Sequence, residues 1–280
     1  MKRAILRKLK RNRLINGARR VLYATSYFNR KYFEILKWGF ESKEDTNYTY
    51  ELKEGNIRYL AQLIAAVTGE PYSVVLGYIQ EAQNDKEVED HVLDAIKRSP
   101  YTAFADFRTG FAKRLGWYAL VRILKPQVVV ETGIDKGLGA VLLCAGLLKN
   151  RAEGFEGEYY GTDINPEAGY LLTGKYKEVG SILFGDSIKS LQSFDKQIDL
   201  FINDSDHSAT YEYNEYLTVK PILSSNAVIL GDNSHVTDKL SQFAIENSRD
   251  FVFFKEEPKD HWYPGGGIGI CYTKDSFRKV

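Results

Sequence analysis

The chain from Pro126 onwards alternates short β-branched and aromatic runs with segments of helical periodicity. Helical segments are expected between the first six of these runs. Such alternation is typical of βαβ units, which build a mainly parallel, doubly wound sheet with helices on both faces. The sequence therefore predicts an α/β domain over residues 124–280. Its strand candidates are 127–133, 158–164, 181–186, 198–204, 227–233, 251–257 and 267–274.

The last two strand candidates are joined by the short segment PKDHWYPGGG, residues 258–267. A parallel connection usually contains a crossover helix, and this segment leaves no room for one. We therefore expect the last two strands to pair antiparallel.

Residues before about 123 have helical periodicity instead of short strand-like runs. Helices are predicted within 56–71, 73–82, 86–100 and 110–126, and Asn56 is a candidate N-cap for the first of them. We divide the chain into a basic helical arm (1–40), a helical region (41–123) and the α/β domain (124–280). The middle region is expected to cover the site, to select its ligand or to form contacts in an oligomer.

Two cysteines, Cys144 and Cys271, lie far apart in apolar segments, so a disulfide framework is not expected and a reducing compartment is favoured. No apolar run approaches the roughly 18 residues of a membrane span. No apolar segment of the signal-peptide type follows the basic N-terminus. These features lead us to expect a cytoplasmic protein.

The basic arm, residues 1–40, contains twelve Lys and Arg but one Glu, although the whole chain has a net charge of only +1. Its apolar residues, such as Ile5, Leu6 and Leu9, recur at helical spacing. Three interpretations remain open. The arm could be a helix that docks on the domain, a segment that binds the phosphate backbone of a nucleic acid, or a helix whose residues 1–22 lie on an anionic membrane. The membrane interpretation would place the protein at the inner membrane surface.

A glycine-rich turn, ETGIDKGLGA, follows the first strand and opens an apolar helix. Glycines 133, 137 and 139 allow a sharp turn and bring backbone N–H groups close to a ligand at a helix N-terminus. The sequence therefore predicts a cofactor here. The spacing Glu131-x-Gly133-x-x-x-Gly137-x-Gly139 differs from that of dinucleotide binders. It resembles the first motif of class I S-adenosylmethionine (SAM)-dependent methyltransferases, which is E/D-x-G-x-x-x-G-x-G.

Further positions match that family in the same order. The resemblance implies that Asp163, after the second strand, holds the ribose hydroxyls of SAM, and that Asp186 and Ser187, after the third, meet the adenine. Each Asp is also a candidate helix N-cap. The family's fold implies a Rossmann-like, seven-stranded, mostly parallel sheet with an antiparallel last strand.

Polar clusters follow the fourth and fifth strands, in FINDSDH (201–207) and VILGDNSH (228–235). If these strands are neighbours, Asp204, Asp232 and Asn233 converge at one edge of the sheet. Two carboxylates and an amide suit a hard cation such as Mg²⁺. The arrangement resembles the Mg²⁺-dependent O-methyltransferases of the catechol and caffeoyl-CoA type, in which these positions hold the metal.

Residues 199–233 also resemble the macrocin O-methyltransferase-type families, which modify sugars of natural products and bacterial glycans. Those families have Pro-Gly-Gly before the fifth strand. This chain has SSNA instead, at residues 224–227, a difference that we expect to affect a turn rather than the site.

The same resemblance implies two candidates for the base that removes a proton from the acceptor. In families with D-x-D it is the second Asp, here Asp206, and in families with D-S-x-H it is the His, here His207. This chain has both, and the choice stays open. Asp206 is also a candidate cap for a helix beginning near Ser208, and His207 could serve only to orient Asp204.

The sequence as a whole predicts a SAM-dependent O-methyltransferase, assisted by Mg²⁺, that acts on a hydroxyl of a sugar, a glycan or a related small molecule. One alternative is an RNA methyltransferase that grips phosphates with the basic arm, although a nucleic-acid partner is the less favoured interpretation. The other is a non-catalytic binding module with a methyltransferase-like fold. Homo-oligomer formation stays open.

Overall fold

The computed structural model describes residues 12–44 and 49–277, so residues 1–11 of the predicted arm lie outside the described part. The chain divides into two compact units. The arm unit comprises Met1–Ser42 with Asp260–Tyr263, and the sheet unit comprises Lys43–Lys259 with Pro264–Val280. Each unit is described separately.

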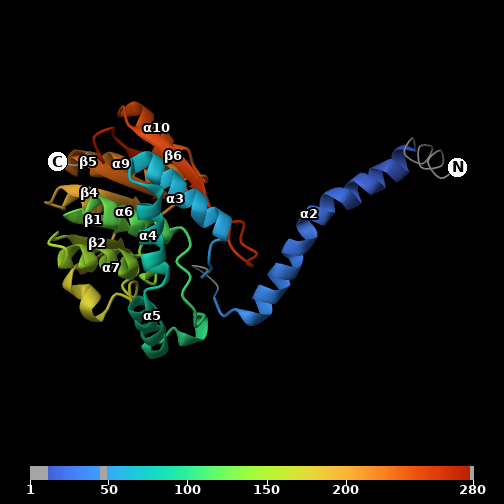
Figure 1. Cartoon of the computed structure of the whole chain (residues 1–280), viewed down its shortest axis with the longest axis horizontal. Helices are drawn as coiled ribbons and strands as arrows, with labels where there is room; N and C mark the ends of the chain where they lie inside the picture. Colours follow the sequence, from blue (N-terminus) through green and yellow to red (C-terminus); the bar gives the residue numbers. More distant parts are fainter. Residues whose placement is uncertain (1–11, 45–48, 278–280) are drawn as a thin grey trace. The chain divides into compact units, whose positions relative to one another are not determined.

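The sheet unit is built on one seven-stranded sheet with the strand order β3-β2-β1-β4-β5-β7-β6 (Figure 1). The first five strands run parallel, whereas β7 pairs antiparallel with both β5 and β6. This confirms the predicted Rossmann-like fold and its antiparallel last strand. The strands are β1 (Val128–Thr132), β2 (Glu158–Asp163), β3 (Gly180–Phe184), β4 (Ile198–Asn203), β5 (Leu223–Asp232), β6 (Asp250–Lys255) and β7 (Gly267–Tyr272).

The strand register brings the predicted site together. Thr132 at the end of β1 is opposite Asn203 of β4, and Asn203 is opposite Gly231 of β5. The carboxyl ends of these three strands therefore meet at one edge of the sheet. Asp204 and Asp232, each one residue further on, become neighbours there.

Helices cover both faces of the sheet. One layer contains α3 (Glu54–Thr68), α4 (Tyr72–Gln83), α5 (Lys86–Arg98), α6 (Arg114–Leu124) and α7 (Leu138–Ala152), and the other contains α8 (Ser187–Gln192), α9 (Ala209–Val219) and α10 (Lys239–Glu246). α7 is buried almost throughout because it lies between the sheet and α6. The short 3-10 helices are η1 (Thr102–Phe104), η2 (Gly174–Glu178) and η3 (Lys220–Ile222).

The connection from β2 to β3 differs from the prediction of a helix between these strands. Among its described residues it contains only the 3-10 helix η2. Gly169 and Gly174 adopt positive φ values of 74° and 57°, which interrupt an α-helix. A Cβ on Gly169 would lie 2.3 Å from the side chain of Ile182, so this turn is held tightly against β3.

Two local predictions were wrong for reasons of tertiary packing. Asn56 is not the N-cap of α3, which is Lys53. The Asn56 side chain instead donates to the Lys255 carbonyl at 2.9 Å and accepts from the Glu257 N–H at 2.8 Å. The SSNA segment forms part of β5 rather than a turn, since β5 begins at Leu223. The register of β5 with β4 shifts at this segment, between the pairing of Ile198 with Leu223 and that of Leu200 with Val228.

The arm unit consists of α2 (Arg13–Glu41) and residues 260–263. Asn12 caps α2 by accepting the N–H groups of Leu14 and Ile15 at 3.0 and 3.2 Å. The ammonium of Lys31 donates to the His261 carbonyl at 2.9 Å. None of the described helices combines the length and apolar composition needed to cross a membrane.

Candidate active site

A cavity of about 430 Å³ opens at the carboxyl ends of β1, β2, β3 and β4. Of the predicted cofactor residues, Gly133, Asp163, Asp186 and Ser187 line it. Asp204 and Asp206 line it as well. The other lining residues were not predicted from the sequence. They are Asp135, Thr162, Ile164, Gly185, Ser205 and Tyr211.

The three glycines of the turn have different structural roles. Gly133 has a φ of 79°, and a Cβ there would lie 2.1 Å from the Asp204 carbonyl oxygen. Only glycine therefore lets the turn after β1 pass this close to the end of β4. Gly137 is the N-cap of α7, and a Cβ on Gly139 would lie 2.7 Å from Oε1 of Glu131. These last two glycines allow close packing and do not line the cavity.

Glu131 is buried behind the turn rather than in the cavity wall, with 2% of its surface exposed. Its carboxyl group accepts a hydrogen bond from the Tyr159 hydroxyl at 2.5 Å. Burial raises the pKa of Glu131 to about 7, although that hydrogen bond and the nearby Arg114 act in the opposite direction. Glu131 is thus a buried acid that changes charge near neutral pH.

Asp163 organises two loops around the cavity. Its Oδ2 accepts the N–H of Asp135 at 2.9 Å, and its Oδ1 accepts the N–H of Asn165 at 2.8 Å. Both oxygens retain acceptor capacity, so the carboxylate can still receive a pair of hydroxyl groups from a ligand. This geometry suits the ribose role that the sequence implied.

The structure confirms that Asp186 is a helix N-cap and also places it in the wall of the cavity. It caps α8 by accepting the Lys189 N–H at 2.9 Å, and it also lines the cavity. Its second oxygen accepts from the Tyr211 hydroxyl at 3.1 Å. Ser187 lies 2.9 Å from the same hydroxyl, so Tyr211 ties the two residues together at the cavity wall.

The predicted metal residues lie together in a second group of charged side chains. Asp204 and Asp232 have side chains that are 15% and 2% exposed. Burial and the Asp232 carboxylate raise the pKa of Asp204 well above its usual value. Burial alone would also raise the pKa of Asp232, but Lys113 and a hydrogen bond from Asp204 hold it below its usual value. The pKa values of these two neighbouring carboxyl groups are therefore shifted in opposite directions.

Lys113, which the sequence analysis missed, lies at the centre of this group. Its ammonium is 2.7 and 2.8 Å from the two oxygens of Asp232 and 3.1 Å from Oδ1 of Asn233. Glu256, which is fully buried, is 3.9 Å away. Burial would lower the pKa of Lys113, but Asp232 and Glu256 raise it, so the ammonium stays charged.

Arg114 adds a second, half-buried cation next to Lys113. Burial tends to lower the pKa of its guanidinium, but Asp204, Asp232 and Glu131 raise it. We name Lys113, Arg114, Asp204, Asp232, Asn233 and Glu256 the charged centre. The available signal in the sequence was the Lys-Arg pair immediately before the apolar run LGWYALV, at the start of α6.

The fit of a divalent cation was tested on these contacts. Asp204, His207 and Asp232 can each offer an atom within 4.8 Å of the others, which is compatible with a metal site. Lys113 contacts both oxygens of Asp232 and the amide oxygen of Asn233, so a cation held by the predicted set of Asp204, Asp232 and Asn233 would compete with this ammonium. A cation at that position would have to displace a buried ammonium.

The structure separates the two base candidates. Asp206 is exposed, lines the cofactor cavity and accepts the Ser208 N–H at 2.7 Å immediately before α9. His207 instead faces the charged centre. Its Nε2 is 3.8 Å from Oδ1 of Asp204 and 3.4 Å from the amide nitrogen of Asn233.

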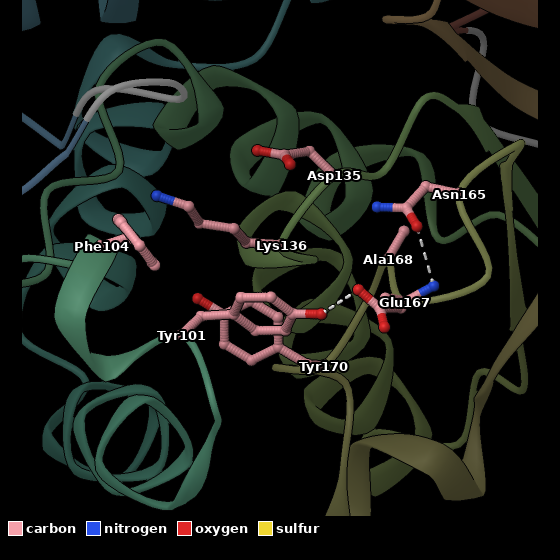
Figure 2. Close-up of a pocket in the computed structure, with 8 residues that line it drawn as sticks. All are labelled: Tyr101, Phe104, Asp135, Lys136, Asn165, Glu167, Ala168 and Tyr170. Carbon is pink, nitrogen blue, oxygen red and sulfur yellow. Dashed lines mark hydrogen bonds between the residues drawn. The ribbon is translucent and has the colours of Figure 1, made fainter.

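A second cavity, of about 280 Å³, shares Asp135 with the first. Figure 2 shows the rings of Tyr101 and Tyr170 lying over one another at its base, with Lys136 above them. The ring centroids are 5.1 Å apart, and the Tyr101 hydroxyl donates to Glu167. The cavity thus combines an aromatic surface with charged and amide groups.

Comparison with known proteins identifies the domain that carries these cavities. A family model described as a methyltransferase domain matches residues 130–234. A comparison with curated proteins gives no match. Among solved structures, this chain is similar to TomG, an O-methyltransferase from Streptomyces achromogenes that is involved in tomaymycin synthesis and was solved in complex with SAM. The two sequences are 12% identical and the TM-score is 0.51. The alignment covers 68% of this chain and 91% of TomG.

An O-methyltransferase from Bacillus cereus, in complex with S-adenosylhomocysteine (SAH), is also similar. It is 14% identical with a TM-score of 0.47, over 77% of this chain and 97% of that one. The likeness to TomG shows a shared fold. Residues 130–234 thus match a methyltransferase domain model, and the chain shares the fold of the SAM-bound methyltransferase TomG.

Proposed function

We propose that this chain is a SAM-dependent O-methyltransferase. The observation that carries the proposal is the cavity of about 430 Å³, whose lining combines Gly133, Asp163 and Asp186 with Asp204 and Asp206. A bound cofactor would thus lie beside carboxyl groups and His207 at the end of β4. That is the arrangement that moving a methyl group onto a hydroxyl requires.

The methyl group of SAM is already reactive, because it is attached to a sulfonium, so the protein must mainly align the acceptor and remove its proton. We propose that His207 is the base that removes the proton from the acceptor hydroxyl. Among side chains, histidine changes protonation nearest neutral pH. Asp206 is the weaker candidate because it is exposed and its Oδ1 accepts the Ser208 N–H, whereas His207 lies beside Asp204 and Asn233.

Lys113 acts in this proposal as a positioning residue. It fixes the amide oxygen of Asn233, and the amide nitrogen of Asn233 faces Nε2 of His207. The ammonium also supplies positive charge beside the acidic pair, which a divalent cation would otherwise supply. The Mg²⁺ predicted from the sequence is therefore not part of the proposed mechanism.

We further propose that the acceptor hydroxyl belongs to a sugar or glycan. The resemblance of residues 199–233 to the macrocin-type families supports this class. The second cavity supports it as well, because sugars bind through stacking of their apolar C–H faces on aromatic rings and through several hydrogen bonds. Tyr101 and Tyr170 offer the rings, and Lys136 and Asn165 offer donors.

Calorimetry with SAH tests the cofactor part of the proposal. The parent chain should release binding heat, and Asp163→Ala should weaken the binding. Absence of binding by the parent chain at near-millimolar SAH would refute the enzyme and leave the non-catalytic binding module. Methyl transfer from labelled SAM to cell-envelope glycan fractions, small phenols and RNA then tests the acceptor. Labelling of RNA alone would replace the glycan proposal with the RNA alternative.

A further inference from the structure

The helix α2 has an apolar face along its whole length. At 100° per residue, ten large apolar side chains fall within about 160° of its circumference. Their exposed fractions range from 43% to 88%. These residues are Leu14, Ile15, Val21, Leu22, Phe28, Tyr32, Phe33, Ile35, Leu36 and Phe40. We call this surface the apolar face of α2.

The contacts within the arm unit are made by the opposite side of the helix. No residue of α2 is buried. Of its half-buried residues, Gly17 lies at the edge of the apolar face, and Asn16, Lys31, Glu34 and Trp38 lie outside it. Residues 260–263 pack against this polar side. Trp262 lies 5.2 Å from the Trp38 ring, and Asp260 is 3.6 Å from Arg30.

Basic residues border the apolar face along both of its edges. Arg19 and Lys37 lie beside one edge, and Arg13, Arg20 and Lys31 lie towards the other. Long basic side chains can keep their charge in the headgroup layer while their stems cover apolar surface. Exposed aromatic rings, abundant on α2, also favour the membrane interface.

Charge decides between a lipid surface and a second copy of the chain. Residues 1–40 carry twelve basic residues against one acidic residue, so pairing two arms would bring like charges together. The apolar face is also wider than the narrow seam of a coiled coil. An anionic bilayer offers both opposite charge and a broad apolar layer.

We propose that the apolar face of α2 lies in the interface of a membrane that contains anionic lipids, with the helix parallel to the surface. Binding combines burial of the apolar side chains with attraction of the basic residues to the headgroups. This inference does not depend on the methyltransferase activity. It assigns the partner of residues 13–41, a longer segment than the 1–22 considered from the sequence.

The test is flotation of the full chain with vesicles of phosphatidylcholine alone or mixed with phosphatidylglycerol. We expect the chain to float with the mixed vesicles, less at high salt, and to remain behind with neutral ones. The apolar-face variant Leu22→Glu/Phe33→Glu should lose binding. The matched control, Tyr23→Glu/Tyr27→Glu, has the same change in charge at exposed positions outside that face and should retain most of it.

Circular dichroism and SAH calorimetry on the variants verify the helix and the fold of the sheet unit. Equal loss of binding in both variants would overturn the role of the apolar face, because only charge would then matter. Failure of the parent chain to float would overturn the proposal. So would a dimer, measured by light scattering without lipid, that Leu22→Glu/Phe33→Glu converts to a monomer, because the apolar face would then bind a second copy.

Discussion

Replacement of Lys113 by methionine should destabilise the protein strongly. Met retains most of the buried aliphatic volume of Lys113 but removes the ammonium that contacts both oxygens of Asp232. The side chains of Lys113 and Asp232 are 7% and 2% exposed, so water cannot solvate the Asp232 carboxylate once the ammonium is removed. Removing one partner of such a buried pair costs about 3–5 kcal/mol. We expect the free energy of unfolding of Lys113→Met to fall by that amount.

An exposed ion pair in the same chain offers a matched control. Lys53 and Glu257 form a pair at 3.1 Å, with side chains 58% and 55% exposed. Exposed pairs of this kind contribute less than about 1 kcal/mol, so Lys53→Met should have little effect. Both variants lose one charge and place Met at a lysine position, which leaves burial as the main difference.

The assay is denaturant unfolding followed by circular dichroism at pH 7, with the free energy of unfolding obtained by linear extrapolation. The double variant Lys113→Met/Asp232→Asn removes both charges and should recover part of the stability lost in Lys113→Met. A loss in Lys113→Met no larger than that in Lys53→Met would refute the reasoning, as would a double variant whose effects simply add.

Three further predictions concern catalysis, metal and pH. In steady-state assays, His207→Ala should reduce kcat by about 10²–10⁴-fold, as expected for loss of a general base, while Asp206→Asn should retain most activity. A large loss in Asp206→Asn with little loss in His207→Ala would instead make Asp206 the base. Activity should be unchanged after EDTA treatment and should not rise on addition of Mg²⁺. If EDTA abolished activity and Mg²⁺ restored it, a metal would be part of the mechanism. Because the folded pKa of Glu131 is raised to about 7, the folded state binds more protons than the unfolded one between about pH 4.5 and 7. Stability contributed by Glu131 should therefore be present at low pH and decline by about 3 kcal/mol as pH rises through this range. Glu131→Gln should lack this decline in unfolding curves measured at pH 5 and pH 8, and an unchanged decline would contradict the assignment.

The sequence by itself determined the sheet, its antiparallel last strand and the place of the site. These features depend on local patterns: strand-like runs alternating with helical ones, a glycine-rich turn after β1, and acidic residues at the carboxyl ends of β2, β4 and β5. Because carboxyl ends of parallel strands meet at one edge, spacing along the chain was enough to predict that Asp204 and Asp232 converge.

Only the tertiary structure decided what those carboxylates contact. Lys113 is 119 residues from Asp232, and Asn56 is 201 residues from its partner Glu257. Such contacts form between a helix layer and the sheet, where no local spacing records them. For the same reason the sequence favoured a metal beside Asp232 and an N-cap role for Asn56, whereas packing gave both side chains partners from distant segments.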